Sequence, residues 1–210
     1  MQQNTGKPAA LEEIINSRRS VRNFGAEIPG LHAIEKIIKA GLNAPYAAAA
    51  VGDRSDFRRF FVISKDSPSR GELERGVDKH LKKTIKKLSS LPFKVLGLTN
   101  KLAKLIERLE KAKLPDAPFI IIIAEYNGIP SVAPQALAHA AENMWLTASA
   151  DGLGFQLLSM FETMKADKAL CKLLGLKPGE YSLLGCAIGV PREPMGPVQR
   201  PEAKTLTKWL

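Results

Sequence analysis

The run APFIIIIAEY, residues 117–126, constrains the fold of this chain more than any other stretch. It holds four consecutive isoleucines and shows no alternation of polar and apolar residues. A continuous β-branched run of this length is typical of a strand that is covered on both faces. Two further strands are predicted at residues 57–65, FRRFFVISK, and at residues 181–191, YSLLGCAIGVP. We therefore expect residues 117–126 to lie at the centre of a sheet.

Amphipathic patterns predict helices before and between these strands. Apolar residues recur at helical spacing over residues 9–17, 28–45 and 131–150. The last of these is rich in alanine, which indicates close packing against another helix, either of the same chain or of a second subunit. Because helices and strands do not alternate regularly, the pattern favours an α+β fold with a mixed sheet. No linker divides the chain, so we expect one domain over residues 1–210.

The positive charge of the chain is concentrated in one segment. The net charge is +10, and residues 79–104 hold many lysines and no carboxylate. Ser67 and Pro68 have the pattern of an N-cap and a first helical residue, so a basic helical region begins there, and the Leu-Pro pair at 91–92 divides it. Two interpretations stay open. The segment at about 67–113 is a helical lid inserted before the central strand, or it is a surface that binds nucleic acid, an anionic membrane, an acidic substrate or a redox partner.

Neither an export signal nor a membrane span is predicted. The N-terminal stretch is polar and then amphipathic, and the longest apolar run has only the length of a strand. We therefore expect a cytoplasmic protein. Cys171 and Cys186 have no histidine at metal-ligand spacing, so we interpret both as reduced packing residues.

An arginine cluster, INSRRSVRNF at residues 15–24, follows the first predicted helix. Guanidinium groups offer forked donors suited to phosphate oxygens, and a serine hydroxyl adds a neutral donor. Arg18, Arg19 and Ser20 are therefore candidate phosphate ligands, and Arg22 points the same way if the segment is extended. The alternative is a solvated basic turn without a ligand.

The other motifs that carry chemistry are incomplete. GLGFQL, from Gly152, lacks the third glycine of a dinucleotide fingerprint and follows a helix, so it is better interpreted as a helix end followed by a close backbone approach at Gly154. His32, His80 and His139 are scattered, and we expect each to be a surface or packing residue. No nucleophile elbow and no zinc motif is present in the sequence, so no metal site is expected and an enzyme of this sequence would use an organic cofactor.

Five segments, in this order and with similar gaps, resemble the nitroreductase family of FMN-dependent oxidoreductases. They are RRSVRNF, AGLNAPYAAAA, APFIIIIAE, AENMWLTASADGLGFQLLSMF and LLGLKPGEYSLLGCAIGVPREP. The resemblance implies an α+β fold with a central mixed, mostly antiparallel sheet flanked by helices. It also implies an intertwined homodimer with FMN at the subunit interface.

The resemblance assigns the arginine cluster to the flavin. It implies that Arg18, Arg19 and Ser20 reach the phosphate and ribityl chain, and that Arg22 reaches the N1 and C2 carbonyl edge. A cation beside N1 stabilises the anionic reduced flavin, so Arg22 would raise the reduction potential.

Further contacts follow from the same resemblance. Pro45, Tyr46 and Ala47 correspond to the stretch that packs on the flavin from the partner subunit, although the usual Asn-x-Gln-Pro-Trp continuation is missing. Tyr46 either offers an aromatic surface or faces the core. The backbone amides that contact N5 correspond to the segment Leu158, Ser159 and Met160, where a common glycine is absent, and Arg200 corresponds to a second phosphate-binding arginine.

The implied activity passes hydride from NADH or NADPH through flavin N5 to a small electron-poor acceptor such as a nitroaromatic or a quinone. The mechanism is ping-pong, and no side chain acts as a catalytic group. NADH and NADPH are equally compatible with the sequence. Two alternatives stay open, namely a flavin-binding or sensing protein with reduced catalytic activity, and a basic protein that binds surfaces through the lysine-rich segment. Nucleic acid and membrane are the less expected partners.

Overall fold

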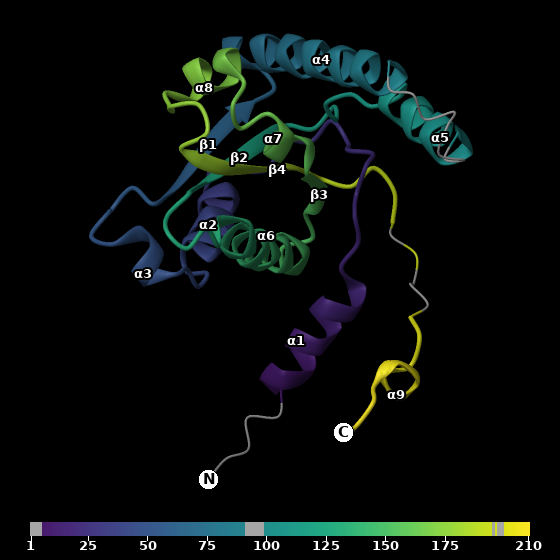
Figure 1. The fold of residues 1–210 in the computed structure, drawn as a ribbon. Coiled ribbons are helices and arrows are strands. Elements are labelled where there is room, and N and C mark those ends of the chain that lie inside the picture. The colour runs from purple at the N-terminus through teal and green to yellow at the C-terminus, as the bar shows by residue number, and fades with distance from the viewer. Residues whose placement is uncertain (1–5, 91–98, 195, 197–199) are drawn as a thin grey trace.

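The computed structural model describes residues 6–90, 99–194, 196 and 200–210. Its sheet has four strands in the order β1-β2-β4-β3, and each neighbouring pair is antiparallel. The strands are β1 (Arg58–Ser64), β2 (Phe119–Tyr126), β3 (Gly154–Leu158) and β4 (Tyr181–Gly189). A parallel component is present as one isolated bridge between Ser20 and Phe155. The three predicted strands are confirmed, and β2 lies inside the sheet as expected (Figure 1).

Helices cover both faces of the sheet. They are α1 (Gly6–Ser17), α2 (Leu31–Leu42), α3 (Ala48–Val51), α4 (Pro68–Ser89), α5 (Thr99–Glu110), α6 (Ala133–Ala150), α7 (Met160–Thr163), α8 (Lys168–Leu174) and α9 (Ala203–Leu206). Alternate isoleucines of β2 point to opposite faces. Ile121 and Ile123 pack with α2 and α6, whereas Ile120 and Ile122 pack with α4, α7 and α8 (Figure 1). This arrangement explains why the strand is apolar at every position.

The alanine-rich helix α6 packs closely on α2. A Cβ added to Gly41 of α2 would lie 2.8 Å from Cγ of Met144 on α6, so the glycine lets the two helices approach. The predicted close contact of this helix is therefore confirmed within the chain. Beyond α6, Gly152 has a φ of +71°, which ends the helix as the sequence predicted.

The lysine-rich helices occupy the connection between β1 and β2. Ser64, the last residue of β1, pairs directly with Phe119, the first residue of β2. Ser67 caps α4, since its side chain accepts a hydrogen bond from the backbone N–H of Ser69 at 3.3 Å. The apolar face of α4 is buried on the sheet and α5 packs beside α4. The predicted division at 91–92 lies outside the described residues.

A buried ion pair joins β1 to β2 and to the end of α2. Nε and Nη2 of Arg58 donate to the two carboxylate oxygens of Glu125 at 2.6 and 3.1 Å. Nη1 donates to the carbonyls of Gly41 and Ala44, both at 2.9 Å, and Nη2 also donates to the carbonyl of Pro45 at 3.2 Å. The five guanidinium donors thus have five acceptors, and Arg58 fixes the chain that leads into α3.

Both ends of the chain extend away from the sheet (Figure 1). The N-terminal helix α1 touches α6, and the short helix α9 lies near the C-terminal end. Both extensions expose large apolar side chains, namely Leu11, Ile15, Leu206, Trp209 and Leu210. In the body of the protein, Cys171 and Cys186 are buried and unpaired, as expected for packing residues. Among the described helices, none has the length and apolar composition needed to cross a bilayer.

Candidate functional site

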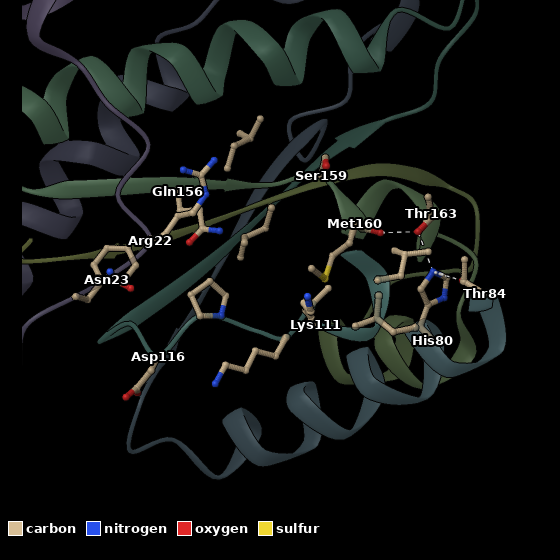
Figure 2. Close-up of a pocket in the computed structure, with 18 of the residues that line it drawn as sticks. Arg22, Asn23, His80, Thr84, Lys111, Asp116, Gln156, Ser159, Met160 and Thr163 are labelled. Carbon is tan, nitrogen blue, oxygen red and sulfur yellow. Dashed lines mark hydrogen bonds between the residues drawn. The ribbon is translucent and has the colours of Figure 1, made fainter. Parts of the chain in front are cut away.

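A cavity of about 700 Å³ opens beside β3, within the range of roughly 300–1,000 Å³ that is typical of small-molecule sites. One wall is the end of β3 and α7, and the other is α4 with the segment that follows α5 (Figure 2). Its polar and charged lining residues are Arg22, Asn23, His80, Thr84, Lys111, Lys113, Asp116, Gln156, Ser159, Thr163 and Arg192.

Arg22 reaches this cavity because its segment lies along β3. The N–H of Val21 donates to the carbonyl of Phe155 at 3.0 Å, next to the parallel bridge at Ser20. Gly154 makes this approach possible, since a Cβ there would lie 2.8 Å from Cγ1 of Val21. The close backbone approach expected at Gly154 is therefore the contact with the arginine segment.

Gln156 lies beside Arg22 in the cavity (Figure 2). Its Oε1 atom is buried and has no hydrogen-bond partner among the described residues. A buried polar atom without a partner costs about 1–3 kcal/mol, so this oxygen is suited to a donor that a ligand supplies. Gln156 was not among the site residues predicted from the sequence. Its signal was a polar residue inside the apolar stretch GFQLL.

Leu158, Ser159 and Met160 line the cavity where β3 ends and α7 begins. A hydrogen-bond chain supports this turn. Thr163 Oγ1 donates to the carbonyl of Met160 at 2.7 Å, and His80 Nε2 lies 2.8 Å from Thr163 Oγ1 (Figure 2). Because the threonine has one proton and gives it to Met160, we assign the proton of this second bond to His80 Nε2.

The charge of His80 follows from its surroundings. Burial lowers the pKa of its imidazole below the ordinary value of 6.5, and the positive charge of Lys83 lowers it further, against the opposing effect of Asp167. His80 is therefore neutral at pH 7. It is a cavity residue rather than an ordinary packing residue, whereas His32 and His139 are exposed as expected.

Positive charge dominates the cavity. Arg22, Lys111, Lys113 and Arg192 line it, and the one carboxylate in its described lining is Asp116. That carboxylate pairs with Lys65 at 2.7 Å, and the hydrogen bond from Lys65 lowers the pKa of Asp116. The balance favours an anionic ligand. No group of three metal-ligating side chains occurs in the described part of the chain.

A comparison with models of protein families identifies the family of this chain. The model of the Nitroreductase family matches residues 15–190, which include the arginine segment, the sheet and the turn at Ser159. The chain belongs to the nitroreductase family. The resemblance seen in the sequence is thereby confirmed. No curated protein sequence matches the chain.

Solved structures share this fold over most of the chain. A nitroreductase with bound FMN from Bacteroides fragilis is 20% identical, with a TM-score of 0.65 over 95% of this chain and 98% of the other. A BluB-like flavoprotein from Clostridium difficile is 22% identical, with a TM-score of 0.66 over 95% and 98%. An iodotyrosine deiodinase bound to FMN and 3-iodo-L-tyrosine is 20% identical, with a TM-score of 0.64 over 92% and 96%. At these identities the likeness shows the nitroreductase fold.

The arginines next to Arg22 have other contacts in this nitroreductase-family chain. The guanidinium of Arg18 stacks on Trp145, 4.2 Å from the ring centroid, and its Nε lies 3.1 Å from Glu142 Oε1. Arg19 donates to three backbone carbonyls, those of Asn16, Arg18 and Gly196. Arg18, Arg19 and Ser20 are therefore close to Arg22 in the sequence, but they do not line the cavity.

The remaining candidate residues of the family motif lie elsewhere in the single chain. Tyr46 is on the surface rather than in the core, and it stacks on Phe57 with ring centroids 4.1 Å apart. Pro45 and Ala47 flank it, and Arg200 is exposed in the C-terminal tail. None of these four lines the cavity. The structure thus brings together Arg22, Leu158, Ser159 and Met160 and leaves the others outside.

Proposed function

We propose that this protein binds FMN in the cavity beside β3 and acts as an NAD(P)H-dependent oxidoreductase. The observation that carries the proposal is Arg22 next to the unpaired Gln156 oxygen, in a cavity with an excess of cations. These groups fit FMN, which has an anionic phosphate and a ring edge with both an N–H donor and carbonyl acceptors. The FMN bound to the solved nitroreductase from Bacteroides fragilis is consistent with this assignment.

When bound, FMN would supply hydride transfer at N5, from NADH or NADPH to a small electron-poor acceptor such as a nitroaromatic or a quinone, in a ping-pong cycle. The side chains of the cavity would orient the flavin and polarise its ring. Arg22 would hold a fixed positive charge beside the ring edge, and Gln156 Oε1 would accept the ring N–H. The hydrogen bonds from His80 to Thr163 and from Thr163 to Met160 would hold in place the turn at Ser159, whose backbone amides would contact N5 when FMN is bound.

We further propose that the protein is a homodimer with two such sites. A largely apolar groove of about 330 Å³ lies along α6, lined by Pro134, Leu137, Ala138, Ala141, Trp145, Leu157, Leu183 and Leu184, with Glu142 and Glu162 also in its lining. Together with the apolar side chains exposed on α1 and near α9, this groove offers a large surface for a second copy. The partner would then contribute Pro45, Tyr46, Ala47 and Arg200 to the flavin site.

We treat residues 1–210 as one FMN-binding domain with an insertion at about 67–113, and we expect it in the cytoplasm, where its electron donors are found. The alternative is a flavin-binding or sensing protein with reduced catalytic activity. This alternative is motivated by the missing Asn-x-Gln-Pro-Trp continuation after Pro45, where alanines occupy residues 47–50.

The visible spectrum of the purified protein, taken under nitrogen before and after NADH and then NADPH, tests the proposal. We expect a flavin spectrum that either donor bleaches. A protein that stays colourless after incubation with excess FMN would contradict FMN binding. A flavin spectrum that neither donor bleaches would favour the sensor alternative.

The role of Arg22 has a separate test in the reduction potential of the bound flavin. Arg22→Gln removes a charge next to the ring edge, so the midpoint potential should fall by about 30 mV, which corresponds to about 1.4 kcal/mol for a two-electron couple. Arg75→Gln, at an exposed position of α4 outside the cavity, makes the same charge change and should leave the potential in place. Equal shifts of the midpoint potential in both variants would show that Arg22 does not lie beside the flavin ring.

A further inference from the structure

A second depression continues the cavity along α4. Its volume is about 880 Å³, and it lies between α4 on one side and α7 and α8 on the other. Lys79, Lys83 and Lys87 line it from α4, and Lys168 lines it from the start of α8. We call these four lysines and the depression between them the lysine groove. His80, Thr84 and Thr163 line both depressions, so the lysine groove adjoins the candidate flavin site, and the hydrogen bond between His80 and Thr163 lies at their boundary.

The lysines of the groove are arranged in a row. Lys79, Lys83 and Lys87 are four residues apart, so they share one face of α4 with about 6 Å of helix rise between neighbours. None of the four groove lysines forms an ion pair with a described residue. A row of about 12 Å with this charge is suited to an extended anion.

Other ionisable groups do not neutralise the groove. Asp167 is the one carboxylate in its described lining, and its Oδ1 already accepts the backbone N–H groups of Ala169 and Leu170, both at 3.0 Å. His80 is neutral at pH 7 because burial lowers its pKa. The groove therefore carries an excess of positive charge that only a ligand or solvent ions can balance.

We propose that the lysine groove binds the phosphate groups of the nicotinamide donor and makes the protein prefer NADPH to NADH. This inference rests on the proposed flavin site, where the nicotinamide would lie near Ser159 and Met160. NADPH is an extended anion, and in this proposal its pyrophosphate and 2′-phosphate would lie along the row of lysines while its ring lies in the adjoining cavity. Lysines are common phosphate ligands as point charges. The 2′-phosphate adds charge that NADH lacks.

The shape and lining of the groove favour a nucleotide over a macromolecule. The lysines surround a concave depression of ligand size, whereas protein partners usually dock on broad surfaces. Nonspecific binding of single strands usually adds aromatic stacking, and the described lining contains no Phe, Tyr or Trp. The lysines that point away from the groove, Lys82 and Lys86, are exposed and line neither depression.

Calorimetric titration of the FMN-loaded protein with NADP⁺ and with NAD⁺ tests the inference without turnover. NADP⁺ should bind at least about tenfold more tightly than NAD⁺ at low salt, and the ratio should shrink as salt screens the lysines. Each lysine–phosphate contact at about 4 Å in water changes affinity about fivefold. The variant Lys83→Gln/Lys87→Gln should therefore weaken NADP⁺ binding by about tenfold after screening.

The matched control is Lys82→Gln/Lys86→Gln, which makes the same charge change on the same helix at the same spacing. We expect less than about a twofold effect on NADP⁺ binding, since these lysines lie outside the groove. Equal effects of the two double variants, or equal affinity for NADP⁺ and NAD⁺ in the natural protein, would overturn the inference. A competition experiment gives a third such outcome. If duplex DNA or anionic vesicles displace NADP⁺, and this displacement requires Lys83 and Lys87, the groove binds a macromolecule or a membrane and the inference is overturned.

Failure of this inference can be told apart from failure of the proposed function. If NADH bleaches the flavin as well as NADPH does and the nucleotides bind equally, the flavin site stands and the groove assignment is lost. If the protein binds no FMN, titration with 2′,5′-ADP against 5′-AMP still examines the groove. Preference for 2′,5′-ADP that depends on Lys83 and Lys87 would then support it, and no preference would refute it.

Discussion

The buried ion pair between Arg58 and Glu125 makes a strong prediction about stability. Both side chains are almost fully buried, and Arg58 also holds the carbonyls of Gly41, Ala44 and Pro45. Arg58→Met would leave the carboxylate of Glu125 buried without its partner. Breaking a buried pair in this way costs about 3–5 kcal/mol, a large share of the roughly 5–15 kcal/mol that stabilises a typical domain.

A milder variant keeps this prediction testable if Arg58→Met does not fold. Arg58→Lys retains the charge but has three donors for five acceptors, so at least two buried oxygens lose their hydrogen bond. At about 1–3 kcal/mol for each, the free energy of unfolding should fall by about 2–6 kcal/mol. Urea denaturation at one fixed protein concentration measures both variants.

The control is Arg59, the next residue of β1. Its guanidinium is half-buried and lies 5.1 Å from the ring centroid of Phe61, so Arg59→Met should cost only about 0.5–1 kcal/mol. A loss below about 1 kcal/mol for Arg58→Met, or equal losses at the two positions, would refute the reasoning. Because Arg58 holds the carbonyl of Pro45, Arg58→Lys should also weaken FMN binding in the proposed dimer.

Two further predictions concern the hydrogen-bond chain at the cavity and the subunit contact. The pKa of His80 is lowered in the folded protein, so the unfolded chain binds more protons below pH 6.5 and the free energy of unfolding falls with falling pH in that window. The variant His80→Gln keeps a hydrogen-bond donor for Thr163 but has no titrating side chain. Urea denaturation at pH 7.5 and at pH 5.5 should therefore show a smaller loss of unfolding free energy than in the natural protein. The control His32→Gln, at an exposed position, should show the same loss as the natural protein. Ala138→Glu adds a charge to the groove on α6, so the protein should become monomeric in light scattering and bind FMN more weakly in fluorescence titration. The control variant His139→Glu, at the exposed neighbouring position, should stay dimeric. If both variants are dimers, this groove is not the subunit contact.

The sequence predicted the framework of the fold because its signals are local. The apolar run of β2, the capping pair at Ser67 and Pro68, and the helical spacing of α2 and α6 each act within a few residues, and the structure confirms all of them. Strand β3 was not predicted. It has five residues and follows a glycine turn, so it is too short to show a period of its own.

The parts of the site that sequence reasoning missed depend on contacts between distant segments. The spacing of strand residues predicts that Arg58 and Arg59 point to opposite faces, but it does not tell which face is buried. His80 meets Thr163 across 83 residues, and the orphaned oxygen of Gln156 becomes visible only when the arginine segment lies along β3. Arg22 and the turn at Ser159 were found from the family motifs, and the fold brings them to one cavity.

The place where the lysine-rich helices join the sheet bears on how such a protein can diversify. Ser64 and Phe119, at the two ends of the lysine-rich connection, are direct partners across β1 and β2. A different helical segment could connect the same two residues without altering the strand register. Any replacement would have to cover the apolar face that Leu73, Val77 and Leu81 now bury. Under that one condition, this wall of the cavity could be replaced as a unit while strand β3, on the opposite wall, remained as it is.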